Sequence, residues 1–131
     1  RARQQPCHPP TLGLKPLAVT VHDPGGHLIT CQRQDGASNM RAKLAGGKAC
    51  GALALGVSSR TIGELAVDRP HLIASLHTMS EGGIVPAAGG VIVCDEDGTI
   101  LGAIGVTGDT SDNDEACALA AIEAVGLNAK T

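Results

Sequence analysis

The 131-residue chain contains no Phe, Tyr or Trp, yet it contains 18 glycines. Aromatic side chains normally supply a large share of the apolar area buried in cores and interfaces. A core built here must therefore come from Leu, Ile, Val and Ala packed between closely approaching backbones. Such a core buries little apolar area within one chain, and contacts between copies of the chain would bury more. The composition thus predicts a homo-oligomer.

Charge and hydropathy narrow the possible partners. The formal net charge is −3 and the pI is about 5.9, whereas proteins that bind nucleic acids usually carry a basic stripe and stacking aromatics. No apolar run approaches the roughly 18 residues of a membrane-spanning helix. We therefore expect neither a nucleic-acid partner nor a membrane span, and a small molecule becomes the expected ligand.

The five cysteines are widely spaced and form no C-x-x-C pair. A disulfide framework or a structural zinc site has a different pattern. We therefore predict reduced thiols in a cytoplasmic protein. Because four of them lie in apolar stretches, they are expected to be buried and unreactive: Cys31, Cys50, Cys94 and Cys117.

The domain organisation is simple. Four prolines within residues 1–16 predict an irregular N-terminal arm, and residues 17–131 are of a length suited to one domain. Period-two alternation over 17–22, followed by the turn Asp23-Pro24-Gly25-Gly26 and a returning strand over 27–33, predicts a β-hairpin.

The rest of the chain alternates helical and strand patterns. Helices are predicted from Ser38 or Asn39 to about Val57, over 62–68 with Ser58-Ser59 at its start, over 72–79 as a short turn, and from 110 to 126 with Ser111-x-x-Asp114 as a capping box. Strands are predicted over 84–87, 91–94 and 100–106. This order, β-β-α-α-β-β-β-α, predicts an α/β (α+β) fold with a mainly antiparallel sheet and helices packed on it.

A cluster of charged residues follows the first hairpin. Arg41 and Lys48 are seven residues apart and share a face of the predicted helix. Arg33 and Asp35 lie at the end of the hairpin, a few residues before that helix begins. Convergent Arg and Lys side chains bind carboxylates well. We therefore predict a pocket for a small acid or a haem propionate, in which Asp35 orients Arg33. A surface cluster of ion pairs is the alternative.

Two further groups could carry chemistry. A haem iron needs an axial donor, and either His77 or Met79 could supply one. An enzyme acting on a small carboxylic acid needs a group that moves a proton, for which Asp35, Glu81 and Asp114 are the candidates. The acids around 109–115 could also hold a cation, although helix capping explains them as well.

Taken in order, the motifs resemble the GlcG/HbpS-like family. The resemblance runs from about Leu17 to Leu127 and rests on these segments: 19–28 (VTVHDPGGHL), 33–37 (RQDGA), Lys48-Ala49, 89–93 (GGVIV), Asp97-Gly98, 102–108 (GAIGVTG) and 114–118 (DEACA). The Pro-rich stretch 1–10 stands where the family has its first long helix.

The resemblance implies a profilin-like α/β sandwich with a five-stranded antiparallel sheet, assembled as a homo-oligomer. It also implies binding of haem or a related tetrapyrrole between subunits. Two other functions remain open: a cofactor-free enzyme acting on a small carboxylic acid in a catabolic pathway, and a structural partner in a catabolic complex.

Overall fold

The computed structural model describes residues 13–130. Its elements, in chain order, are β1 (Ala18–His22), β2 (Leu28–Arg33), α1 (Met40–Leu55), α2 (Ser59–Asp68), α3 (Pro70–Met79), β3 (Gly90–Cys94), β4 (Ile100–Thr107), α4 (Ser111–Ala124) and β5 (Asn128–Lys130). The predicted arm at 1–16 lies largely outside the described residues, and its described part, 13–16, has no helix or strand.

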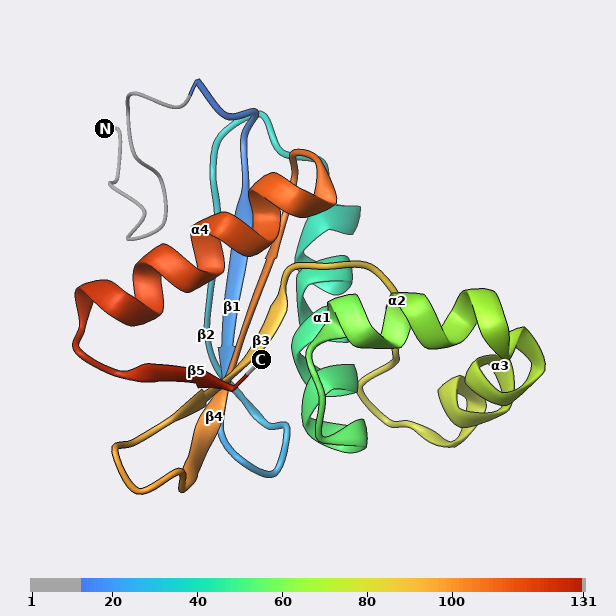
Figure 1. Ribbon diagram of the computed structural model, residues 1–131. Coiled ribbons are helices and arrows are strands. Elements are labelled where there is room, and N and C mark those ends of the chain that lie inside the picture. The colour runs from blue at the N-terminus through green and yellow to red at the C-terminus, as the bar shows by residue number, and fades with distance from the viewer. Residues whose placement is uncertain (1–12, 131) are drawn as a thin grey trace.

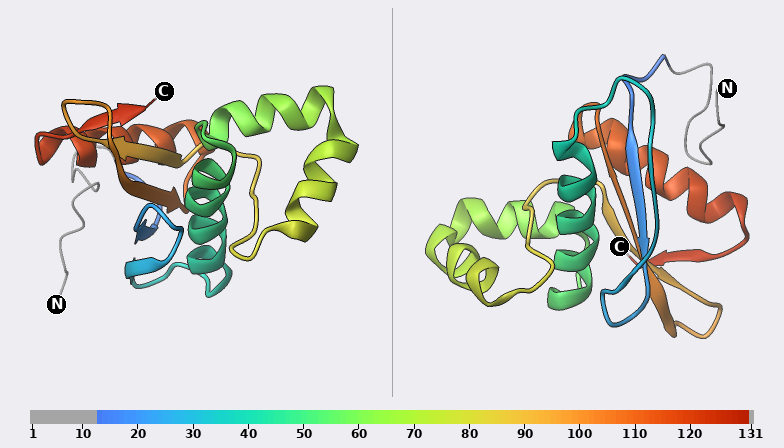
Figure 2. Two further views of the ribbon diagram at one scale, coloured as in Figure 1. Left: turned by 90° about the horizontal axis from the view of Figure 1, so that it is seen from below. Right: turned by 180° about the vertical axis from the view of Figure 1, so that it is seen from behind.

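The five strands form one sheet in the order β2-β1-β4-β3-β5. Every neighbouring pair is antiparallel. Helix α4 covers one face of the sheet and α1 covers the other, while α2 and α3 project to one side (Figure 1 and Figure 2). This arrangement confirms the predicted mixed α/β fold with a five-stranded antiparallel sheet.

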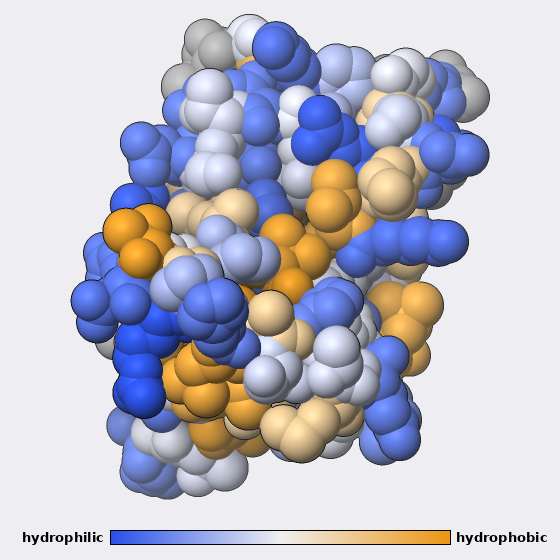
Figure 3. Space-filling view, turned by 90° about the vertical axis from the view of Figure 1, so that its right-hand side faces the viewer, coloured by the Kyte–Doolittle hydropathy of each residue, from blue (hydrophilic) through white to orange (hydrophobic). Residues whose placement is uncertain are grey.

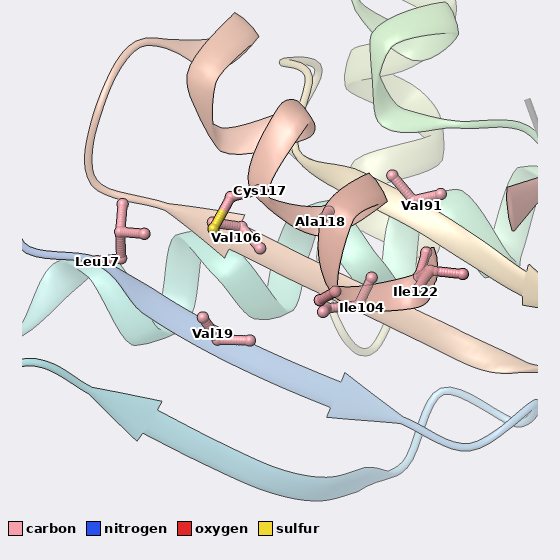
Figure 4. Close-up of a cluster of buried hydrophobic side chains, with 9 residues drawn as sticks. Leu17, Val19, Val91, Ile104, Val106, Cys117, Ala118 and Ile122 are labelled. Atoms are coloured by element: carbon pink, nitrogen blue, oxygen red, sulfur yellow. The ribbon is translucent and has the colours of Figure 1, made fainter. Parts of the chain in front are cut away.

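The larger core cluster lies between the sheet and α4. Figure 4 shows side chains of α4 meeting alternate residues of the three central strands. Alternation along β1 places Leu17 and Val19 on this side and leaves Ala18 and Thr20 facing α1. The members of the cluster are small or medium aliphatic residues and one thiol: Leu17, Val19, Val91, Ile104, Val106, Cys117, Ala118, Ala121 and Ile122.

Helix α1 lies against the other face almost backbone to backbone. A Cβ atom at Gly105 of β4 would overlap the carbonyl oxygen of Ala45, and one at Gly90 of β3 would overlap the carbonyl of Lys48. On another side of α1, a Cβ at Gly51 would come within 3.2 Å of Ile84 Cα. The sequence predicted that backbones approach closely in a core without aromatics, and the contacts at these glycines confirm it.

Helices α2 and α3 form a hairpin with its own small core. Ile62, Ile73 and Ile84 pack together there, apart from the sheet. Ser58 caps α2 by accepting a hydrogen bond from the Thr61 N–H, and Pro70 occupies the first turn of α3. Figure 3 views this side of the molecule and shows apolar side chains interspersed among polar ones on its surface.

In the C-terminal half, one predicted strand is wrong and one strand was not predicted. Residues 84–87 are not a strand, and the fifth strand is β5, which pairs with β3 after α4. The run at 84–87 is apolar because Ile84 packs against α2 and α3, not because it pairs in the sheet. Periodicity cannot distinguish these two reasons in so short a segment.

The predicted capping box at α4 is also wrong. Thr110 is the N-cap, and its hydroxyl accepts a hydrogen bond from the Asn113 N–H. Asp114 instead points into the protein, and Asp112 lies beside Arg60 of α2. The predicted C-terminal end is confirmed, because Gly126 has φ 76° and Leu127 N–H donates to the Ile122 carbonyl.

None of the helices in the described part of the chain is both long and apolar enough to cross a membrane.

Candidate ligand-binding site

A pocket of about 270 Å³ lies where the β1–β2 turn meets the C-terminal half of α1. The turn supplies Pro24–His27, α1 supplies Cys50, Leu53 and Ala54, and the segment after α3 supplies Ser80–Gly82. Three segments that are distant in the sequence therefore form its walls. Its lining combines apolar surface with an imidazole, a thiol and one carboxylate.

His27 stands at this pocket in a defined orientation. Its Nδ1 lies 3.2 Å from Asp23 Oδ1, and the same oxygen accepts hydrogen bonds from the N–H groups of Gly25 and His27. These backbone donors, the one from His27 first, lower the pKa of Asp23. Because a carboxylate only accepts, Nδ1 is the ring nitrogen that carries a proton in this contact. A carboxylate that orients histidine in this way is common among metal-binding histidines.

Cys50, which lines the pocket, lies next to the buried His22. Cys50 Sγ donates to the Gly26 carbonyl at 3.4 Å and lies 3.6 Å from His22 Nδ1. Burial raises the pKa of the Cys50 thiol, which therefore stays protonated at neutral pH. On the α1 side of β1, His22 Nε2 and Thr20 Oγ1 are buried, and neither has a hydrogen-bond partner among the described residues.

Lys48 and Asp114 form a buried ion pair at the opposite end of the sheet. Lys48 is 4% exposed and Asp114 is 1% exposed, and the Nζ–Oδ2 distance is 3.1 Å. Nζ also donates to the Val106 carbonyl, and Asp114 Oδ1 accepts from the Asp109 N–H. Burial lowers the pKa of Lys48 below 10.5, opposed by the charge of Asp114. The pair therefore connects α1 to the start of α4.

Arg33 and Arg41 lie at the same end of the sheet as this ion pair. Ala18 pairs with Arg33 on one side and with Thr107 on the other. Arg41 donates to Thr107 Oγ1 at 3.3 Å, whereas Arg33 donates to the Ala37 carbonyl at 2.6 Å. The predicted charged set is thus brought to one end of the sheet, but Lys48 is turned inward. Asp35 is exposed, two residues beyond β2.

His77 and Glu81 lie near the pocket end instead. His77 Nδ1 lies 3.0 Å from the Ile84 nitrogen and 3.2 Å from its carbonyl oxygen, which ties α3 to the following segment. Glu81 lines the pocket, while His77 does not. The predicted ligand residues are therefore divided between two ends of the sheet.

Sequence reasoning missed His27, His22 and Cys50, because the pocket is formed by segments far apart in the chain. One local signal was available: Asp before Pro-Gly-Gly favours a turn in which its carboxylate binds the following N–H groups. The prediction of buried thiols is correct for Cys94 and Cys117, but Cys31 is exposed. None of the four described cysteines forms a disulfide.

Comparison with known proteins gives a family match and several structural relatives. The model of the family described as "Haem degrading protein HbpS-like" matches residues 11–123. A search of curated proteins found no match.

Among solved structures, PduOC in its haem complex has a TM-score of 0.79 at 24% identity, over 93% of this chain and 86% of the other. HbpS has a TM-score of 0.72 at 27% identity, over 85% and 74%. A double mutant of HbpS from Streptomyces reticuli has a TM-score of 0.73 at 26% identity, over 86% and 73%. The family match covers most of the chain, and it shows that the protein belongs to the HbpS-like family.

Proposed function

We propose that the protein binds haem or a related tetrapyrrole as a homo-oligomer. The observation that carries this proposal is the match of residues 11–123 to a family described by haem degradation. Similarity to HbpS and to PduOC in its haem complex supports it. The chain's own contribution is chemical: it offers guanidinium groups for propionates and imidazoles for iron.

The residues present fit such a ligand in part. Arg33 and Arg41, at one end of the sheet, are suited to the two propionates, since guanidinium binds carboxylate bidentately. His77 and His27 are the candidate iron ligands, and the Nδ1–H of His27 is already held by Asp23. A pocket of about 270 Å³ is smaller than the roughly 300–1,000 Å³ usual for drug-sized ligands, so a second subunit would have to complete it.

Haemin titration followed by the Soret band tests the proposal. We expect saturable binding with a shifted band. Arg33→Lys keeps the charge but removes the planar fork, so it should weaken binding while leaving the thermal midpoint unchanged. His77→Ala and His27→Ala, measured separately, should identify the iron ligand, because only loss of the true ligand alters the band position. A protein that leaves the haemin spectrum unchanged would contradict the proposal.

One observation favours a second function, an enzyme acting on a small carboxylic acid without a cofactor. Glu81 lines a pocket whose volume suits a small molecule better than a tetrapyrrole. In this version Glu81 moves the proton, because Asp114 is buried against Lys48 and Asp35 lies at the other end of β2. Turnover of a short-chain carboxylic acid by the parent, lost in Glu81→Gln, would support it. Absence of turnover across such acids would exclude it.

A further inference from the structure

The side chains that line the pocket at the β1–β2 turn present acceptors to it, because their donors are already used within the protein. The Cys50 thiol donates to a carbonyl of the turn at 3.4 Å, and the Ser80 hydroxyl donates to the Gly83 carbonyl at 3.2 Å. The Nδ1–H of His27 is directed to Asp23. These side chains therefore offer a ligand the lone pairs of the Ser80 oxygen and, in the neutral ring, of His27 Nε2.

The backbone adds few donors to this lining. The N–H groups of residues 25–27 all bind Asp23, two through its carboxylate and one through its carbonyl. Pro24 has no N–H, and the lining residues of α1 use theirs within the helix. The segment after α3 supplies the remaining backbone donors, those of Glu81 and Gly82. A ligand rich in N–H donors therefore suits this lining better than one rich in acceptors.

The charge of the lining favours a cation. Glu81 is a carboxylate of this lining, and the described residues that form it include no Lys or Arg. Asp23 and His27 face each other at 3.2 Å, so together they add no positive charge. A cleft lined by one sign of charge concentrates ligands of the opposite sign. A small acid would meet Glu81 without a counter-ion, whereas a small cation would form an ion pair with it.

The composition of the chain decides which kind of cation fits. Quaternary ammonium groups are bound by aromatic cages, and this chain contains no Phe, Tyr or Trp. A cation held here must therefore be recognised through its N–H groups. A primary ammonium has three such donors, for which Glu81, Ser80 and neutral His27 supply acceptors. Leu53 and Ala54 of α1 supply apolar surface for the attached carbon chain.

We propose that this pocket binds a short-chain primary amine, with Glu81 as the counter-ion of its ammonium group. The volume of about 270 Å³ corresponds to roughly nine water molecules at about 30 Å³ each, which is enough for a short alkyl chain and its ammonium group. This inference goes beyond haem binding and does not depend on it. It also gives the pocket a ligand of opposite charge to the substrate of the small-acid enzyme, so one set of probes separates the two.

Saturation-transfer NMR on the full chain compares three ligands with the same butyl chain: butylamine, butyrate and butyltrimethylammonium. The titrations are made at about pH 8, where an alkylamine carries its charge. Butylamine should bind with a dissociation constant on the order of 1 mM, because a ligand of so few atoms binds weakly. The other two should bind at least about tenfold more weakly. Absence of butylamine binding, or equal binding of either other ligand, would overturn the proposal. Binding of butyrate alone would favour the small-acid enzyme instead.

Variants of Glu81 place the amine in this pocket. Glu81 is exposed, so its replacement should leave the thermal midpoint unchanged. Glu81→Gln removes the charge at nearly constant size and should weaken butylamine binding at least about tenfold. Glu81→Lys should reverse the preference, so that butyrate binds and butylamine does not. Glu123→Gln is the matched control, because Glu123 is exposed on α4, which covers the other face of the sheet (Figure 1), and it should bind butylamine as the parent does. Parental butylamine affinity in Glu81→Gln, or an unreversed preference in Glu81→Lys, would overturn the assignment.

Discussion

At the scale of single residues, the most consequential finding is that Lys48 has a structural role. Its ammonium is enclosed between the Val106 carbonyl and Asp114. The side chain reaches this position past Gly89, where a Cβ would lie 2.9 Å from Nζ. The Gly89-Gly90 pair thus makes room for both the backbone and the side chain of Lys48. A lysine that looked like a ligand group in the sequence joins the two helical layers.

Replacing Lys48 tests this role. We expect Lys48→Met to lower the free energy of unfolding by about 3–5 kcal/mol, because it leaves the Asp114 carboxylate buried without its counter-ion. The double variant Lys48→Met, Asp114→Leu should recover a large part of that loss. Urea unfolding measures both. Equal stability of the parent and Lys48→Met would show that the pair contributes nothing.

A second residue-scale prediction concerns acid stability. The Lys15 N–H, the Asn113 side chain and the Thr110 N–H, in that order of effect, lower the pKa of Asp109 from 3.8 to about 2. The unfolded chain therefore binds more protons than the folded chain between about pH 4 and pH 2, so stability falls as the pH falls through that range. Asp109→Asn should flatten this dependence of the thermal midpoint. An unchanged slope in Asp109→Asn would contradict the assignment.

At the scale of elements, helix α1 shows how glycines replace the missing large side chains. A helix containing Gly46, Gly47 and Gly51 is intrinsically weak, since each glycine costs about 1 kcal/mol relative to alanine. Close packing offsets this cost, because Gly105 of β4 and Gly51 of α1 let neighbouring backbones come close to α1. Not every glycine has this function, because a Cβ at Gly46 would make only an ordinary contact, 3.9 Å from the His22 ring.

This difference between glycines gives a paired prediction. Gly105→Ala should destabilise the protein by about 1–3 kcal/mol, because the new Cβ would overlap the backbone of Ala45. Gly46→Ala should be neutral or stabilise by up to about 1 kcal/mol, because helix propensity rises and the space exists. Thermal unfolding of both variants measures the effect. Similar midpoints for the two would refute the close-packing explanation. By the same reasoning, Gly51→Val should be destabilising.

At the scale of the whole molecule, the structure consists of a main body and a projecting helical hairpin that has a small core of its own. The sheet, α1 and α4 form the main body, whereas α2 and α3 project from it around Ile62, Ile73 and Ile84 (Figure 2). Val67 and Met79 of this hairpin are 86% and 72% exposed. Regions with a small buried core open more readily than the central strands.

Hydrogen exchange tests this division. Amides of α2 and α3 should exchange faster than those of β1 and β4 in the parent protein. Ile73→Ala removes part of the small core and should accelerate exchange within 59–79 far more than in β4. Uniform acceleration across the sheet would show instead that the protein opens as one unit.

The sequence by itself determined the elements whose signals are local. The hairpin turn at Asp23–Gly26, the start of α2 at Ser58 and the end of α4 at Gly126 depend on residues adjacent in the chain, and each was predicted. The ordered motifs likewise indicated the family and the sheet. The ligand roles of Arg33, Asp35, Arg41, Lys48 and His77 remain predictions.

Only the tertiary structure decided which groups meet. In the structure, Lys48 points inward and pairs with Asp114, and the fifth strand is β5, not the predicted 84–87. The turn before β2 lies beside Cys50 and Glu81 in the pocket. Each outcome depends on contacts between segments tens of residues apart. Helical or strand periodicity reports only which face of an element is apolar, and it carries no information about which distant segment covers that face.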